Sequence, residues 1–322
     1  MLRPPMRRLV RAAGILLVLL LSLSGLLAAQ PGRVAAGIVD QAAATAIPTA
    51  APTSSTGSGI DVEFTFKSIQ QGRVGLILIN GGQLASATVS ALDRVYPCFP
   101  THSGFGCLLA VPMDEPVKAG YPVTVTVTTQ GGNSLPAANS FAVTSGGFLA
   151  ETLTLPHSLL YLLRDDVQAN EDTRLLNAYR LITPERYWEG AFSKPVNSGP
   201  ISPFGGIRSY NGIANRRHTG QDLQAVTGTP VLASASGRVV LSRLMDIHGN
   251  NIVIDHGWGI YSEYAHLSER YVVPGQFVLQ GQIIGLSGST GRSTGPHLHW
   301  EIAVNGIWVS PLDFIQIALP AS

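Results

Sequence analysis

Two histidines separated by a single residue lie near the C-terminal end of the sequence, in the segment Gly295-Pro-His-Leu-His-Trp-Glu-Ile302. Residues i and i+2 share a face in a β-strand, whereas in a helix they diverge by about 200°. Apolar residues occupy the alternate positions, so the pattern predicts a strand with one face packed on a core. The other face then presents His297, His299 and Glu301. Paired imidazoles on one strand face can contribute to a zinc site.

A second pair of potential metal ligands lies upstream, in Arg217-His-Thr-Gly-Gln-Asp-Leu223. His218 and Asp222 are four residues apart, a spacing that places both on one side of an extended chain, and Gly220 lets the backbone bend between them. With one nitrogen from the His-Leu-His segment, this pair supplies three protein ligands. A fourth position is then open to water, as a catalytic zinc site requires. A third element, Tyr261-Ser-Glu-Tyr-Ala-His266, is a strand-like run that ends in another histidine.

The region that must position these histidines is predominantly β. From about Phe192 to Phe314 the sequence is rich in strand-forming residues and contains turn signals such as Pro274-Gly275. These features predict a C-terminal domain built on antiparallel β-sheet. For His248 and His256, in the same region, we expect ordinary structural roles, with a backbone hydrogen bond the simplest role for His256.

A separate β-rich unit precedes this region. Short runs of strand-forming residues occur at Val62–Phe66, Arg73–Ile79, Ala87–Leu92, Cys107–Val111, Val123–Thr128 and Phe141–Thr144. Such runs, punctuated by Gly, Pro and Asn and lacking helical periodicity, favour an antiparallel, Ig-like β-sandwich. Apolar residues at helix-like intervals between about Ser158 and Trp188 predict one or two short helices that link the two domains.

The N-terminus has the charge-then-apolar order of an export signal. Four arginines precede an apolar run that extends from Gly14 to Ala29. Small residues end this run, but the Leu26-Leu27 pair stands where a cleavage site prefers a second small residue. Counted from Ala12, the run has 18 residues and is just long enough to span a bilayer, so a removed signal and a retained membrane anchor are both open. Either one predicts an extracytoplasmic location, in the periplasm or cell envelope or as secreted protein.

Export bears on the two cysteines, because disulfides persist in oxidising compartments and are rare in the cytosol. Cys98 and Cys107 flank a turn-like stretch between two apolar runs. We therefore expect an intrachain disulfide that clamps a hairpin, and two unpaired buried thiols are the alternative.

The balance of charge excludes one class of partner. The formal net charge is +1, from 21 basic and 20 acidic residues. Such a chain has no broad electrostatic attraction to nucleic acid. Nucleic acid is therefore not an expected partner.

The candidate residues and their order resemble the M23 (lysostaphin-like, LytM-type) zinc metallopeptidases. The resemblance covers about residues 192–314 and includes the motifs Ser202-Pro-Phe-Gly205, Arg208-Ser-Tyr-Asn-Gly212, His218-Thr-Gly-Gln-Asp222, Gly228-Thr-Pro-Val231, Gly249-Asn-Asn-Ile-Val-Ile-Asp-His-Gly257, Tyr264-Ala-His266 and Ser293-Thr-Gly-Pro-His-Leu-His-Trp-Glu301. It implies that His218, Asp222 and His299 are the ligands of one zinc ion. It implies that His266 and His297 are catalytic histidines that do not bind the metal.

The resemblance also implies an activity. A zinc-dependent endopeptidase of this family hydrolyses peptide bonds in peptidoglycan, in stem peptides or cross-bridges, during cell-wall remodelling or lysis. Zinc lowers the pKa of a bound water from 15.7 towards about 7, and the two unligated histidines would orient that water and carry its proton to the leaving amine. The main alternative is a non-catalytic M23-like module that binds peptidoglycan or activates a separate amidase. Tyr264 and Arg208 could contact substrate. The alternatives, that Tyr264 is a core residue and that Arg208 is solvent-exposed, are at least as well supported by the sequence.

We therefore expect a mostly β chain of five segments: a signal peptide or signal anchor (1–30), an Ala/Thr/Pro/Ser-rich flexible linker (31–59), an Ig-like β-sandwich domain (60–146), a helical linker (147–191) and an M23-like peptidase domain (192–316). The β-sandwich domain is expected to position the enzyme, to inhibit it or to contact the cell wall.

Overall fold

The computed structural model describes residues 53–55 and 59–321 of the 322-residue chain. Strands account for most of the regular structure in these residues, so the mostly β prediction is confirmed. The predicted signal peptide or signal anchor and nearly all of the predicted linker lie outside the described residues. Among the helices described, none is both long enough and apolar enough to cross a membrane.

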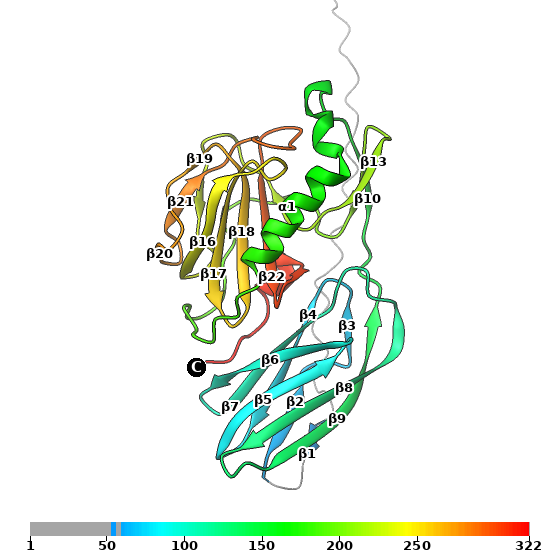
Figure 1. Ribbon diagram of the computed structural model, residues 1–322, viewed down its shortest axis with the longest axis vertical. Helices are drawn as coiled ribbons and strands as arrows, with labels where there is room; N and C mark the ends of the chain where they lie inside the picture. The colour runs from blue at the N-terminus through cyan, green and yellow to red at the C-terminus, as the bar shows by residue number, and fades with distance from the viewer. Residues whose placement is uncertain (1–52, 56–58, 322) are drawn as a thin grey trace, which may run out of the picture. The chain divides into compact units, whose positions relative to one another are not determined.

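The first β unit contains the strands β1 to β9, which pair in the order β1-β2-β4-β7-β6-β5-β8-β9-β3 (Figure 1). Their bounds are β1 (Thr53–Ser55), β2 (Asp61–Phe64), β3 (Ser68–Gln70), β4 (Val74–Asn80), β5 (Leu84–Ala91), β6 (Arg94–Thr101), β7 (Gly104–Ala110), β8 (Lys118–Thr129) and β9 (Ser134–Thr144). Along β8, Val123, Val125 and Val127 are buried while the threonines between them are partly exposed, which is the two-residue period of a strand with one face on a core. The finer prediction of an Ig-like sandwich stays a prediction.

The predicted disulfide is present in this unit. Cys98 on β6 and Cys107 on β7 are directly opposed in the antiparallel register, and their sulfurs are bonded. The bridge therefore clamps the β6–β7 hairpin, as the sequence indicates.

Two strands of this unit differ from the sequence expectation. β1 falls inside the stretch expected to be linker, and it pairs antiparallel with β2. β6 was not among the predicted strands, because Pro97 and Pro100 interrupt its pattern. Both proline nitrogens lack a hydrogen-bond donor, which usually argues against a strand inside a sheet.

The segment between the β units consists of β10 (Ala150–Leu153), a 3-10 helix η1 (His157–Leu163) and the helix α1 (Asp165–Ala178). Two acidic residues in the first turn of α1 favour its start, because they complement the helix dipole. The predicted helices are therefore confirmed. β10 was not predicted, and it pairs in parallel with β12 (Ile207–Tyr210) of the C-terminal unit.

The C-terminal unit is organised around a sheet of order β11-β14-β22-β18-β17-β16-β20, with β23 paired to β22. The remaining bounds are β11 (Pro200–Ser202), β13 (Ala214–Arg217), β14 (Gln221–Leu223), β15 (Pro230–Leu232), β16 (Gly237–Leu244), β17 (Asn250–Gly257), β18 (Ile260–Leu267), β19 (Glu269–Arg270), β20 (Phe277–Val278), β21 (Ile283–Leu286), β22 (Leu298–Val304), β23 (Ile307–Val309) and α2 (Pro311–Phe314). The His-Leu-His segment lies at the start of β22, where the apolar residues Leu298, Trp300 and Ile302 are fully buried.

The face of this sheet opposite Leu298, Trp300 and Ile302 is covered by α1 (Figure 1). Leu175 and Tyr179 of α1 pack with Val253 of β17, Tyr261 of β18 and Ala303 of β22 in one buried cluster. Because these three strand residues come from three adjacent strands, the helix lies across the middle of the sheet.

Candidate metal centre

Three potential ligand atoms converge from β14, β22 and the turn before β14. His218 Nε2 lies 3.1 Å from Asp222 Oδ1 and 3.1 Å from His299 Nδ1, and Asp222 Oδ1 lies 2.9 Å from His299 Nδ1. The antiparallel register places Asp222 directly opposite His299. The structure therefore brings together the three residues that the sequence singles out as ligands, and all three are buried.

The outward nitrogens of the two rings fix which nitrogen faces the centre. His218 Nδ1 donates to the carbonyl of Pro203 at 2.6 Å, and His299 Nε2 donates to Glu301 Oε1 at 2.9 Å. Both partners are acceptors only, so each neutral ring carries its proton on the outside and turns a lone pair inward. A carbonyl or carboxylate in this position is the usual partner of a metal-bound histidine.

This arrangement fits a zinc ion. Ligand bonds of 2.0–2.2 Å in a tetrahedral site separate neighbouring ligand atoms by about 3.3 Å, close to the observed separations. Two nitrogen lone pairs and a carboxylate oxygen facing one another repel unless a cation lies between them. Two imidazoles with one carboxylate are also a donor set that zinc accepts, and three protein ligands leave a position open.

Gly220 allows the close approach of β14 to β22. A Cβ atom at this position would lie 2.7 Å from the His299 ring and 2.7 Å from the carbonyl oxygen of Trp300. Any side chain here would push the two ligand strands apart, so the glycine is needed for space as well as for the bend expected from the sequence.

His266 and His297 lie beside the three converging atoms. The His266 and His297 ring centroids are 4.8 Å apart, and His297 Nε2 is 3.6 Å from Asp222 Oδ1. His266 Nδ1 lies 2.8 Å from the carbonyl oxygen of Thr290, and His297 Nδ1 lies 2.8 Å from that of Gly295. Each ring is thus held by a backbone acceptor through Nδ1. His266 also has a φ of 60°, a left-handed conformation that costs energy for a non-glycine residue and is concentrated at functional sites.

Burial and neighbouring side chains together set the charge states of His266, His297 and Asp222. It lowers the pKa of His266, where the neighbouring imidazoles add to the effect, and it lowers the pKa of His297. Both rings are therefore neutral bases near neutral pH. Burial alone would raise the pKa of Asp222, but His218 and His299 outweigh it and hold the pKa of Asp222 well below its usual range. Asp222 is therefore a carboxylate.

Arg208 on β12 fixes the second oxygen of Asp222. Its NH2 group donates to Asp222 Oδ2 and, at 2.6 Å, to Ser202 Oγ, while its Nε donates to Glu151 Oε2 at 3.0 Å. Only 8% of Arg208 is exposed, which excludes the alternative of a solvated arginine. Glu151 is opposite Arg208 in the parallel β10–β12 register, and no sequence signal linked this residue to the site.

A buried acidic network extends from the centre to α1. Trp308 Nε1 donates to Glu301 Oε2 at 2.6 Å, and the Tyr179 hydroxyl donates to Glu263 and Glu301. Glu171 of α1 accepts hydrogen bonds from the backbone nitrogens of Ile247 and His248. These contacts tie the helix to the strands and loop around the site.

His248 has a hydrogen-bond partner, as expected of a structural histidine, and it also lies beside the centre. Its Nδ1 lies 2.6 Å from Glu171 Oε1, and its ring centroid lies 5.7 Å from that of His299. His248, His299 and Glu301 could also hold a cation as a group. In the observed arrangement the His299 Nε2–H donates a hydrogen bond to Glu301, so that nitrogen has no free lone pair for a metal.

His256 and Tyr264, the remaining residues named from the sequence, are buried and hydrogen-bonded within the protein interior. His256 is buried, with Nδ1 2.9 Å from the carbonyl oxygen of Ser236, which agrees with the predicted backbone hydrogen bond. The Tyr264 hydroxyl is buried and accepts from the backbone nitrogen of Ser234 at 2.7 Å. Tyr264 is thus a core tyrosine.

Comparisons with known sequences agree with this geometry. Residues 216–311 match peptidase family M23. The chain is 51% identical over 103 residues to the peptidoglycan DD-endopeptidase ShyA of Vibrio cholerae, a match that covers 32% of this chain and 23% of the relative. It is 41% identical over 137 residues to lysostaphin of Staphylococcus simulans, covering 41% of this chain and 26% of the relative. The chain therefore spans about a quarter of the length of these curated relatives.

One solved structure extends the similarity beyond the matched domain. A crystal structure of a Pseudomonas aeruginosa protein assigned to peptidase M23 superposes with a TM-score of 0.57 at 25% sequence identity. The superposition covers 76% of this chain and 93% of that chain. The similarity in fold thus includes residues upstream of the family match.

Proposed function

We propose that the chain, whose residues 216–311 match peptidase family M23, is a zinc-dependent endopeptidase that hydrolyses peptide bonds in peptidoglycan. Its substrates are stem peptides or cross-bridges of the cell wall. The observation that carries this proposal is the triangle of His218 Nε2, Asp222 Oδ1 and His299 Nδ1, with two further imidazoles beside it. A purely structural zinc site usually completes four-fold coordination with protein ligands, and this one supplies three.

We assign His218, Asp222 and His299 as the ligands of one zinc ion. When bound, zinc supplies a Lewis acid that polarises a carbonyl group and lowers the pKa of a bound water towards about 7. The protein prepares the site by holding both imidazole lone pairs inward through Pro203 and Glu301. Arg208 leaves one oxygen of the Asp222 carboxylate for the metal by binding the other.

His266 and His297 are the proton-transfer residues in this proposal. Both are neutral near neutral pH, so either can accept a proton from an attacking water and deliver it to the amine that leaves when the peptide bond breaks. Backbone carbonyls hold their Nδ1 atoms, which leaves the Nε2 atoms for water and substrate. A protonated imidazole can then donate a hydrogen bond to the oxyanion.

The upstream β unit, residues 60–146, is in this proposal an Ig-like sandwich that positions the enzyme, inhibits it or contacts the wall. The chain acts outside the cytoplasm after export by residues 1–30. The disulfide between Cys98 and Cys107 supports an oxidising compartment. N-terminal sequencing of the protein from fractionated cells tests this: a new terminus near residue 30 indicates cleavage, and Met1 in the membrane fraction indicates an anchor. Recovery of the intact chain only from the cytosol would contradict export.

Product analysis tests the proposed activity. The full chain is incubated with purified peptidoglycan, with and without a chelator, and soluble fragments are identified by mass spectrometry. We expect new peptide termini, with peptides still attached to their sugars, and their loss on chelation. A non-catalytic module or amidase activator predicts no new peptide termini from the zinc-loaded chain alone, and that result would exclude the endopeptidase.

A further inference from the structure

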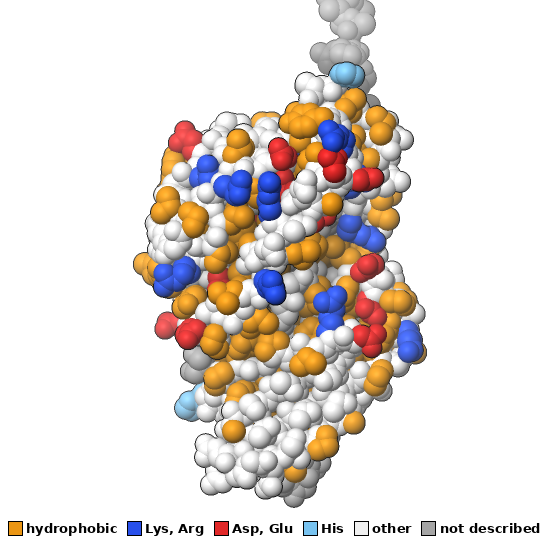
Figure 2. Space-filling model, viewed as in Figure 1, with side chains coloured by type: hydrophobic (Ala, Val, Ile, Leu, Met, Phe, Trp, Pro, Cys, Tyr) orange, Lys and Arg blue, Asp and Glu red, His pale blue; other side chains and the backbone are white. Residues whose placement is uncertain are grey.

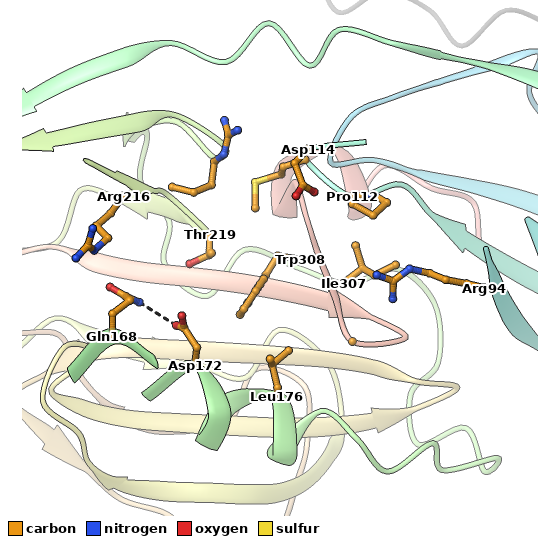
Figure 3. A pocket seen from close by; sticks show the side chains of 13 residues that line it. Arg94, Pro112, Asp114, Gln168, Asp172, Leu176, Arg216, Thr219, Ile307 and Trp308 are labelled. Carbon is orange, nitrogen blue, oxygen red and sulfur yellow. Dashed lines mark hydrogen bonds between the residues drawn. The ribbon is translucent and has the colours of Figure 1, made fainter. Parts of the chain in front are cut away.

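A second, larger pocket adjoins the metal centre, and none of the proposed ligands or catalytic histidines lines it. Its volume is about 510 Å³, and its lining includes Arg94, Asp114, Asp172, Leu176, Arg217 and Trp308. Figure 3 shows Trp308 near the middle, with Asp172 and Leu176 of α1 on one side and Asp114 on the other. The lining therefore comes from α1, from the C-terminal strands and from the first β unit.

The two β units are joined by specific contacts near this pocket. They belong to one compact unit in the described part of the chain. Asn305 Nδ2 donates to the carbonyl oxygen of Leu108 at 3.2 Å. The backbone nitrogen of Ser310 donates to the carbonyl oxygen of Gly72 at 2.7 Å. Asn305 lies in the turn before β23, and Ser310 directly follows β23. The same strand supplies Trp308 to the pocket.

The larger pocket shares lining residues with a smaller cavity at the ligands. A cavity of about 50 Å³ is lined by His218, His266 and His299, and it shares Asp172 and Trp308 with the larger pocket. A cavity of this size holds a few water molecules at most. The larger pocket therefore lies beside the ligands and has room for residues that flank a scissile bond.

The pocket offers both signs of charge in groups whose hydrogen-bonding capacity is unused or only partly used by the protein. Arg94 forms no hydrogen bond or ion pair with another side chain in the described residues, and Asp114 likewise has none. Arg217 uses one nitrogen, at 2.9 Å from the carbonyl oxygen of Gly205. Its remaining donors are available. Asp172 accepts one hydrogen bond, from Gln168 at 2.8 Å (Figure 3).

We propose that this pocket binds the substrate segment on one side of the scissile bond and selects peptides that carry both a free carboxylate and a free amine. Arg94 receives the carboxylate, because a guanidinium matches its two oxygens, and Arg217 adds a second positive charge. Asp114 and Asp172 receive the amine. Trp308 and Leu176 contact the aliphatic part of the peptide. This inference rests on the proposed endopeptidase function.

Binding in the pocket is also linked to the metal centre. Trp308 Nε1 donates to Glu301 Oε2 at 2.6 Å, and the other oxygen of Glu301 accepts from His299 Nε2 at 2.9 Å. A peptide that packs on Trp308 thus contacts the residue that orients Glu301 and, through it, one proposed ligand. This path connects substrate recognition to the alignment of the site.

Calorimetry with a zinc-loaded, full-length His297→Ala variant tests the proposal without turnover. The probes are the peptide acetyl-Ala-Gln-Lys-Ala, the same peptide with an amidated C-terminus, and the same peptide with an acetylated lysine. We expect each modification to raise Kd about tenfold or more, since a charge-assisted hydrogen bond contributes about 1.5–3 kcal/mol.

A second substitution locates the carboxylate. Adding Arg94→Gln should raise Kd about tenfold for the free carboxylate and leave the amidated peptide unchanged. Arg174→Gln, on an exposed position of α1 outside the pocket lining, is the matched control and should change neither Kd. Equal Kd values for all three peptides, or an Arg94→Gln variant with unchanged discrimination, would overturn the proposal. Both results are independent of cleavage, so failure of the endopeptidase assay is a separate outcome.

Discussion

The two β units bury very different interiors. In the described residues of the first unit, through residue 146, no acidic, basic, amide, serine or threonine side chain is fully buried. The C-terminal unit, together with α1, buries six histidines and the carboxyl groups of Asp222, Asp255, Glu171, Glu263 and Glu301. One unit is an ordinary apolar core held by a disulfide, and the other is an apolar core with a polar site built into one face.

The difference shows where the chain gives up stability for chemistry. A buried polar group is unfavourable unless it is hydrogen-bonded, and a partly satisfied network is worse than an apolar one. Around the ligands nearly every outward atom has a partner, from Pro203 on His218 to Trp308 on Glu301. The three inward atoms are the exception, and they are the ones that a cation would satisfy.

The largest expected effect separates catalysis from metal binding within the polar unit. His297→Ala should reduce the rate of peptide cleavage by about 10²- to 10⁴-fold, because it removes a proton-transfer group. His299→Ala should also abolish cleavage, and it should lose zinc, whereas His297→Ala should keep one zinc per chain. Parallel rate and zinc measurements check this, and loss of zinc from His297→Ala would assign that residue as a ligand instead.

Acid should destabilise the polar unit through His256. Burial lowers the pKa of His256 to about 4, whereas an unfolded histidine has its ordinary value of 6.5. Between pH 6.5 and 4 the unfolded state binds a proton that the folded state does not, so stability is complete above pH 6.5 and declines as pH falls to 4. The loss is about 3 kcal/mol, from roughly 2.5 units at 1.36 kcal/mol each.

Denaturant unfolding at several pH values measures this loss. His256→Gln has no titrating group at this position, so its stability should depend less on pH over the same window. Equal pH dependence of the two proteins would show that His256 is not the group responsible.

Removing the disulfide tests the apolar unit. The Cys98→Ser/Cys107→Ser double variant should lose about 2–3 kcal/mol of stability, as the loop-entropy estimate gives for a loop of about ten residues. Zinc content and cleavage per folded molecule should not change, because the bridge joins β6 and β7, which carry none of the proposed ligands or catalytic histidines. A large loss of activity in folded protein would show that the two units are coupled more tightly than their interiors indicate.

The smallest expected effect concerns the partner of Asp222. Arg208→Met should weaken zinc binding by about 10- to 100-fold, the usual range when a group that orients a ligand is removed. Glu151→Gln should have a smaller effect in the same direction, since it acts through Arg208. Competition with a chromophoric chelator measures both constants, and zinc affinity equal to that of the unmodified chain would contradict this role for Arg208.

The sequence predicts the ligand strands better than their surroundings. Alternation around His297 and His299 depends on local backbone periodicity, so β22 follows from it. The even spacing of His218 and Asp222 predicts one extended chain, whereas His218 lies in the turn before β14 and only Asp222 lies in the strand. Glu151 and Glu171 reach the site from β10 and α1 through tertiary packing, which no local pattern encodes.

The same limit applies to individual side chains. Arg208 looks like a solvated arginine until its partner strand is known, and His248 looks like an isolated loop histidine until α1 is placed beside it. The proline-containing strand β6 was missed for the opposite reason, because its local pattern argues against the pairing that the disulfide-bonded hairpin adopts.

A zinc titration of the metal-free full chain tests the endopeptidase proposal most directly. The release of amino groups from purified peptidoglycan is measured as zinc is added, together with the zinc bound per chain. We expect the rate to rise in proportion to bound zinc and to level off at one ion per chain. If zinc binding saturates at one ion per chain while the rate stays at the metal-free level, the site binds metal without hydrolysing peptides and the proposed function is wrong.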